Sequence, residues 1–163
     1  MEQPKYKAVM NTPIRTHRLE WEAFIEFQDD IVRIELDEAK ALAKEYAPDK
    51  YAKLEPDIDT FDEHYPDLFL DKMGIDFLVE HRGQRYAIDL TTGNRCTVKS
   101  KLKNMREILP FIEQLNAKPV VLRSPKGFMP MDVFKLIEDC PWNDGIKDCR
   151  LGDDLKLVKV KST

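Results

Sequence analysis

The chain has 163 residues, of which 42% are hydrophobic and 34% charged, and its formal net charge is −4. These values predict one soluble domain, residues 1–163, with a sizeable hydrophobic core. No apolar run approaches the roughly 20 residues that span a membrane, and the N-terminus lacks a signal-peptide core. The three cysteines suit neither a zinc site nor a disulfide framework. We therefore expect a cytoplasmic protein with no membrane partner.

The segment from Leu19 to Leu36 fits either one helix or two strands. Apolar residues alternate with mostly acidic ones from Leu19 to Phe27, and Asp29-Asp30 can turn the chain back, which favours a β-hairpin. We therefore expect an N-terminal extension over about residues 1–36, either a β-hairpin or a helix, attached to a core over about residues 37–163.

The next segment is rich in alanine and lysine, which predicts a helix from Glu38 to about Tyr46 with Asp37 as its N-cap. Residues from Pro48 to Pro66 carry several acidic side chains and few large apolar ones. This composition predicts a surface loop.

The stretch from Gly74 to Thr91 has apolar residues with a period of two in each half, on either side of Arg82-Gly83. This pattern predicts a β-hairpin with a two-residue turn. The turn sets the pairing register, which matches Phe77 with Ile88, Val79 with Tyr86, Glu80 with Arg85, and Asp76 with Asp89. Two carboxylates then share one face of the hairpin, with Cβ atoms on the order of 5 Å apart.

The remaining segments complete a mixed α/β sandwich. Helical spacing predicts an amphipathic helix from Ser100 to Leu115, with Ser100 as N-cap. A short apolar run over Lys118–Arg123 predicts a buried strand beside the hairpin. A helix from Met131 to Glu138 and an edge strand from Leu155 to Val160 follow.

The order Gly74-Ile75-Asp76 and then Asp89-Leu90-Thr91 resembles the core of the PD-(D/E)xK nuclease superfamily, over roughly the middle half of the chain. The resemblance implies a single-domain, mixed-sheet sandwich of the restriction-endonuclease-like type. In that family two acidic residues on neighbouring strands precede a lysine by two positions. Asp76 and Asp89 match the acidic positions, but Thr91 stands where the lysine is expected. The positive charge would then come from Lys99, Lys101 or Lys103, of which Lys99 and Lys103 are preferred.

The resemblance also implies a Mg²⁺ or Mn²⁺ ion held by Asp76 and Asp89, and Glu38 or Glu45 could supply a third ligand. The distribution of charge suits a nucleic-acid partner, since Arg18–Glu80 holds 19 acidic and 7 basic residues whereas Asn94–Lys126 holds 8 basic and 2 acidic. The basic side chains expected to contact a phosphate backbone are Arg95, Lys99, Lys101, Lys103 and Arg106.

Two functions follow as hypotheses. The first is a metal-dependent, endonuclease-like phosphodiesterase acting on DNA in preference to RNA, in which Asp76, Asp89, Thr91, Lys99 and Lys103 are the catalytic candidates. The alternative is a catalytically inactive module on the same scaffold that binds nucleic acid or a protein partner, because Thr91 lacks the lysine's charge. Either protein could act as a homodimer or as a subunit of a larger complex.

Overall fold

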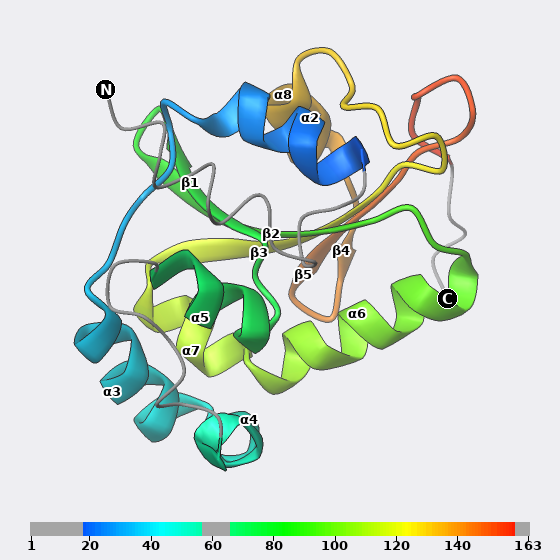
Figure 1. Cartoon of the computed structure of the whole chain (residues 1–163). Coiled ribbons are helices and arrows are strands. Elements are labelled where there is room, and N and C mark those ends of the chain that lie inside the picture. The colour runs from blue at the N-terminus through cyan, green and yellow to red at the C-terminus, as the bar shows by residue number, and fades with distance from the viewer. Residues whose placement is uncertain (1–17, 57–65, 159–163) are drawn as a thin grey trace.

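A five-stranded mixed sheet lies at the centre of the computed structural model, which describes residues 18–56 and 66–158 (Figure 1). The strand order is β1-β2-β3-β5-β4. β1 pairs antiparallel with β2, β2 and β5 flank β3 in parallel, and β4 pairs antiparallel with β5. The strands are β1 (Phe77–His81), β2 (Gln84–Thr91), β3 (Ala117–Arg123), β4 (Trp142–Asn143) and β5 (Ile146–Arg150).

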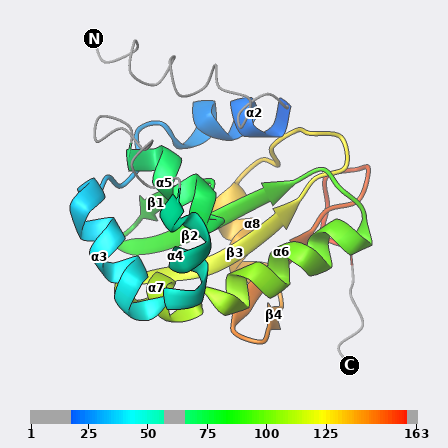
Figure 2. The same cartoon turned by 60° about the horizontal axis from the view of Figure 1, so that its bottom comes forward.

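Helices cover both faces of this sheet, as Figures 1 and 2 show from two directions. The helices of the described ranges are α2 (Arg18–Phe27), α3 (Leu36–Tyr46), α4 (Pro48–Leu54), α5 (Pro66–Met73), α6 (Arg95–Glu107), α7 (Leu109–Gln114) and α8 (Val133–Asp139). Helices α3, α5, α6 and α7 share one hydrophobic core with one face of the sheet. Helices α2 and α8 share a second core with the opposite face. The coarse expectation of a mixed α/β sandwich is therefore confirmed.

The predicted hairpin is present with the predicted register. Phe77 pairs with Ile88, and Val79 pairs with Tyr86. The turn residues Arg82 and Gly83 have φ angles of 52° and 79°, and positive φ at both central positions belongs to the type I′ turn, whose twist matches that of the flanking strands. The predicted buried strand is also confirmed, since β3 lies directly beside β2.

The hairpin favoured for the segment after Leu19 is wrong, because residues 18–27 form the helix α2. Its residues Leu19, Ala23 and Phe27 are each fully buried and repeat every four positions, so one face of the helix packs on the sheet. After the helix, Ile31 forms a bridge to Val79. The segment after α2 therefore lies along the outer edge of β1 for a short distance and does not form a hairpin with residues 19–27.

Two helix predictions and one loop prediction need correction. Helix α3 matches the predicted helix, but it begins at Leu36, so Asp37 lies inside it and is not the N-cap. Residues 48–54 form α4 rather than a loop, whereas residues 57–65 of the predicted loop lie outside the described residues. The predicted helix over 100–115 is two helices, because Pro110 has no amide hydrogen to continue the first one.

The predicted edge strand over residues 155–160 is wrong. Within the described part of residues 155–160, only Leu157 forms a β-bridge, to Leu151, and residues 159 and 160 lie outside the described part. The sheet edge is instead β4, which follows α8 and leads into β5. Helix α8 itself spans nearly the predicted residues.

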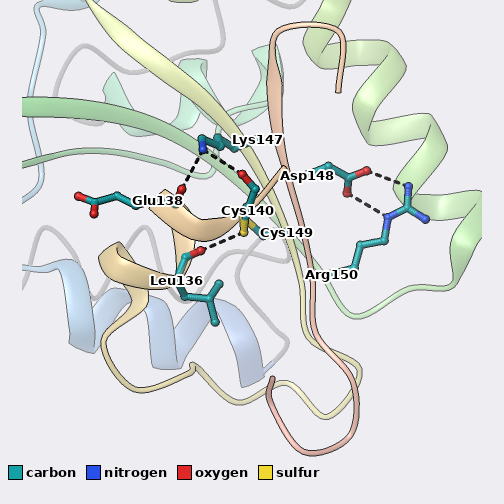
Figure 3. The surroundings of a disulfide bond; sticks show 7 residues. All are labelled: Leu136, Glu138, Cys140, Lys147, Asp148, Cys149 and Arg150. Atoms are coloured by element: carbon teal, nitrogen blue, oxygen red, sulfur yellow. Dashed lines mark hydrogen bonds and ion pairs between the residues drawn. A yellow bond between two sulfur atoms is a disulfide. The ribbon is translucent and has the colours of Figure 1, made fainter. Parts of the chain in front are cut away.

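Strand β5 carries charged side chains that are buried, which hid it from an apolar pattern. Lys147 donates hydrogen bonds to the carbonyl oxygens of Glu138 (3.0 Å) and Cys140 (2.9 Å), and Arg150 donates two hydrogen bonds to the carboxylate of Asp148 (Figure 3). Each buried charge thus has a partner, as burial requires. A disulfide between Cys140 and Cys149, which the cysteine count did not suggest, joins the end of α8 to this strand.

In the described ranges, none of the helices has both the length and the apolar character that crossing a membrane requires.

Candidate functional site

Asp76 lies just before β1, and Asp89 lies near the end of β2. The two side chains lie side by side at this end of the hairpin. The amide of Asp76 donates to the carbonyl oxygen of Ile88 (2.9 Å), and the amide of Leu90 donates to Oδ2 of Asp76 (2.8 Å). The Asp76 carboxylate thus accepts a hydrogen bond that a strand carbonyl would otherwise accept. Because the Asp76 side chain continues the pairing of β1 with β2, its position is fixed by the sheet.

Asp89 is the buried member of this pair, with only 4% of its surface exposed. Burial raises the pKa of the Asp89 carboxyl well above its usual range, and the nearby negative charge of Asp76 raises this pKa further. Two adjacent carboxylates at the edge of a core therefore repel each other, and a positive charge placed between them would relieve that repulsion.

Lys101, on α6, is the cation that the fold brings to this pair. Its Nζ lies 3.3 Å from Oδ1 and 3.2 Å from Oδ2 of Asp89. Burial acts to lower the pKa of Lys101, but attraction to Asp89 and then to Asp76 outweighs burial, so that this pKa is raised. Lys101 therefore stays an ammonium at neutral pH.

A cleft of about 680 Å³ opens beside these three side chains. Its walls come from α4, α5, α6, the end of β2, the segments just before β1 and after β2, and one residue of α2. The residues that line it are Glu20, Lys50, Asp71, Lys72, Gly74, Asp76, Asp89, Leu90, Thr91, Thr92, Gly93, Thr97, Ser100, Lys101 and Asn104.

A close backbone approach fixes the corner between α5 and β1, just before Asp76. Gly74 has a φ of +109°, and a Cβ placed there would clash with Nδ2 of Asn104 on α6. The same Nδ2 donates a hydrogen bond to the carbonyl oxygen of Met73 (3.2 Å). This contact holds the strand that carries Asp76 against the helix that carries Lys101.

The structure does not bring Lys99 or Lys103 to the carboxylates. Both side chains are exposed and neither lines the cleft. Thr91 does line it, but this residue is buried and its Oγ1 accepts a hydrogen bond from the amide of Gly93 (2.9 Å). Thr91 is therefore a structural neighbour of the pair, and the positive charge comes from Lys101.

Glu38 and Glu45, the candidates for a third metal ligand, are exposed on α3 and lie outside the cleft. Among the described residues, no group of three or more acidic, histidine or cysteine side chains has the spacing of a metal site. The carboxylate pair would thus have to be completed by water and substrate oxygens, a coordination that Mg²⁺ commonly has.

The five basic residues predicted to contact phosphates do not form one surface. On a helix of about 3.6 residues per turn, Thr97, Ser100, Lys101 and Asn104 share the flank that lines the cleft. The other four cations lie on the opposite flank, where Nε of Arg106 is 3.2 Å from a carboxylate oxygen of Asp144. That flank holds Arg95, Lys99, Lys103 and Arg106.

Two acidic residues of the cleft were not predicted from the sequence. Glu20 is buried to 5% exposure on α2, and Asp71 lies on α5 where its charge raises the pKa of Lys101. A helical reading of the first segment would have drawn attention to Glu20, because it adjoins Leu19 on the buried face. The favoured hairpin concealed this position.

Comparisons with known proteins give no match: no family model, curated protein or solved structure is significantly similar to this chain. The likeness to PD-(D/E)xK nucleases therefore stays a prediction from the residues around Asp76 and Asp89, and any function has to be argued from the geometry of the cleft.

Proposed function

We propose that the chain is a metal-dependent phosphodiesterase of the restriction-endonuclease-like type that acts in the cytoplasm on nucleic acid, with DNA as the preferred substrate. The observation that carries this proposal is the meeting of Asp76, Asp89 and Lys101 at one cleft. Two carboxylates and one ammonium, brought from two strands and a helix, suit phosphoryl transfer because that reaction needs both a metal site and a compensating positive charge.

The carboxylate pair fits Mg²⁺ or Mn²⁺. Hard divalent cations prefer oxygen ligands and often use only one or two carboxylates, with waters and substrate phosphates completing the shell. Burial and Asp76 raise the pKa of Asp89, and a divalent cation bound beside this carboxyl would favour its charged form. When bound, the metal would polarise the scissile phosphate and lower the pKa of an attacking water.

Lys101 would supply the charge that Thr91 cannot. Its ammonium is held at the carboxylates by Asp89, so that it points into the cleft where a phosphate would enter. There it would offset the negative charge that develops on the phosphoryl oxygens. Removal of one such electrostatic contact typically lowers the rate on the order of 10² to 10³.

One observation favours the alternative of an inactive binding module. Lys101 lies close to both oxygens of Asp89 and therefore neutralises this carboxylate without any metal ion. A chain that had lost catalysis would gain stability from such an ion pair, and the cleft would remain as a site for a ligand.

Calorimetric titration of Mn²⁺ into the purified chain separates these two functions. The matched variant is Asp76→Asn with Asp89→Asn, because the asparagine oxygen at position 76 can still accept the hydrogen bond from Leu90. Saturable binding by the wild-type chain alone supports the proposed site and justifies a cleavage screen on DNA and RNA. If both proteins bind Mn²⁺ equally, or neither binds, the metal site is wrong and the binding module is the better proposal.

A further inference from the structure

We propose that the substrate is a single strand whose phosphate backbone crosses the cleft and is held by Lys50 and Lys72, without readout of the bases. This inference rests on the proposed function, since it names the kind of nucleic acid that the same cleft admits. It moves the nucleic-acid contacts away from the outer flank of α6.

The depth of the site argues for a single strand. Asp89 is 4% exposed and lies at a cleft of about 680 Å³, a volume typical of small-ligand pockets, which span about 300–1,000 Å³. A DNA duplex resists bending, with a persistence length of about 150 base pairs, so bringing one of its phosphates to a buried carboxylate costs deformation energy. A flexible strand can bring one phosphate to the carboxylates and pass its neighbours along the walls.

Lys50 and Lys72 stand on the wall that faces α6. Lys50 belongs to α4 and Lys72 to α5, and both line the cleft. Within residues 18–56 and 66–158, neither ammonium forms an ion pair. Helix α4 also contacts α6 through the ion pair of Lys53 with Glu107 (3.5 Å). Lys50 and Lys72 are therefore available to contact the phosphates of a strand that lies in the cleft.

The charges of the cleft make this contact dependent on the metal. The lining carries four acidic side chains, Glu20, Asp71, Asp76 and Asp89, against the three cations Lys50, Lys72 and Lys101. A polyanion meets no net attraction in this cleft until a divalent cation is added. Binding of the strand should then strengthen with the metal, and weaken steeply with salt.

The composition of the lining also predicts weak discrimination among bases. Apart from Leu90, its uncharged members are small or hydrogen-bonding residues such as Thr92, Thr97 and Ser100, and no aromatic side chain is among the lining residues described. Proteins that hold single strands by their bases use aromatic side chains as stacking surfaces. This cleft offers contacts to phosphate and sugar only, which position a strand but carry no sequence information.

Fluorescence anisotropy with a labelled 20-nucleotide DNA of mixed sequence tests the inference, with Ca²⁺ added so that binding is measured without turnover. The probes are the single strand, the RNA of the same sequence and the matching duplex. The variant Lys50→Gln/Lys72→Gln removes the proposed contacts. The matched control Lys99→Gln/Lys103→Gln removes the same charge from the outer flank of α6.

We expect either single strand to bind more tightly than the duplex. In the Lys50→Gln/Lys72→Gln variant, affinity should fall at least tenfold and the slope of log K against log salt should flatten by about 1.4, at about 0.7 per phosphate contact for single strands. The control should match the wild type. Tighter binding of the duplex, a loss of affinity confined to the α6 control, or no binding of any probe would overturn the inference.

Titration of Mn²⁺ into the same variants separates this inference from the proposed function. Lys50 and Lys72 are not metal ligands in the proposal, so the double variant should still bind Mn²⁺ as the wild type does. If Mn²⁺ binds and the lysine variant retains full affinity for the strand, the metal site stands and only the path of the strand is wrong. If Mn²⁺ does not bind at all, the proposed function fails first.

Discussion

Substitution of Gly74 by alanine tests the corner that joins the two halves of the site. Its φ of +109° is costly for any residue with a Cβ, by about 1–3 kcal/mol. The new methyl group would also displace Nδ2 of Asn104 from the carbonyl oxygen of Met73, and a hydrogen bond of this kind contributes about 1 kcal/mol. We therefore expect Gly74→Ala to lose about 3 kcal/mol of stability, which corresponds to a fall in Tm of about 6–12 °C.

Thermal unfolding followed by circular dichroism measures this loss, and Asn104→Ala provides the control. Alone, Asn104→Ala should cost about 1 kcal/mol, since it removes only the hydrogen bond to Met73. The double variant loses the hydrogen bond only once. The stability losses of the two single variants should therefore add up to about 1 kcal/mol more than the loss in the double variant. A Tm for Gly74→Ala close to that of the wild type, or strict additivity of the two substitutions, would refute the proposed contact.

Three further predictions concern the site and the β5 edge. Lys101→Gln should lower the cleavage rate by about 10² to 10³ while Lys99→Gln leaves it unchanged, as a gel assay of product formation would show. Equal losses in the two variants would contradict the assignment of Lys101. Thr91→Lys should not raise activity, because Lys101 already supplies the charge. It should lower the free energy of unfolding in chemical denaturation by about 1 kcal/mol, through loss of the hydrogen bond from Gly93. A more active variant would show that the site lacks a cation. Reduction of the Cys140–Cys149 disulfide, whose cysteines are nine positions apart, should lower the free energy of unfolding by about 2–3 kcal/mol. Identical melting curves with and without reductant would show that the bond does not form in solution.

The hairpin was predictable because its determinants are local. Alternating apolar residues define the faces of β1 and β2, and the two-residue turn at Arg82-Gly83 fixes the register between them. The neighbouring position of Asp76 and Asp89 follows from that register alone. Local pattern therefore located the carboxylates of the site.

The helix α2 was not predictable in the same way, since Leu19, Ala23 and Phe27 satisfy both a period of two and a spacing of four. What decides between them is tertiary: Ile31 occupies the outer edge of β1 through its bridge to Val79. The sequence around Leu19 contains no information about that edge. Long-range packing thus selected the helix over the strand.

The choice of lysine failed for a related reason. Residues two positions apart point about 200° apart around a helix, so Lys101 lies on the opposite flank of α6 from Lys99 and Lys103. Asn94 accepts a hydrogen bond from the amide of Thr97 and caps α6 well before Ser100, which places Lys99 inside the helix. Which flank of α6 lines the cleft is decided by how the helix packs on the sheet, and the sequence pattern alone does not give this.

The hydrogen bond from the amide of Leu90 to Asp76 gives this aspartate a second reason to persist. Its loss would leave a backbone donor at the edge of the sheet without its acceptor, so selection on folding alone would retain an acceptor here even in a chain with no catalytic role. Among relatives of this protein, a retained Asp76 would therefore not by itself show that the chemistry is retained.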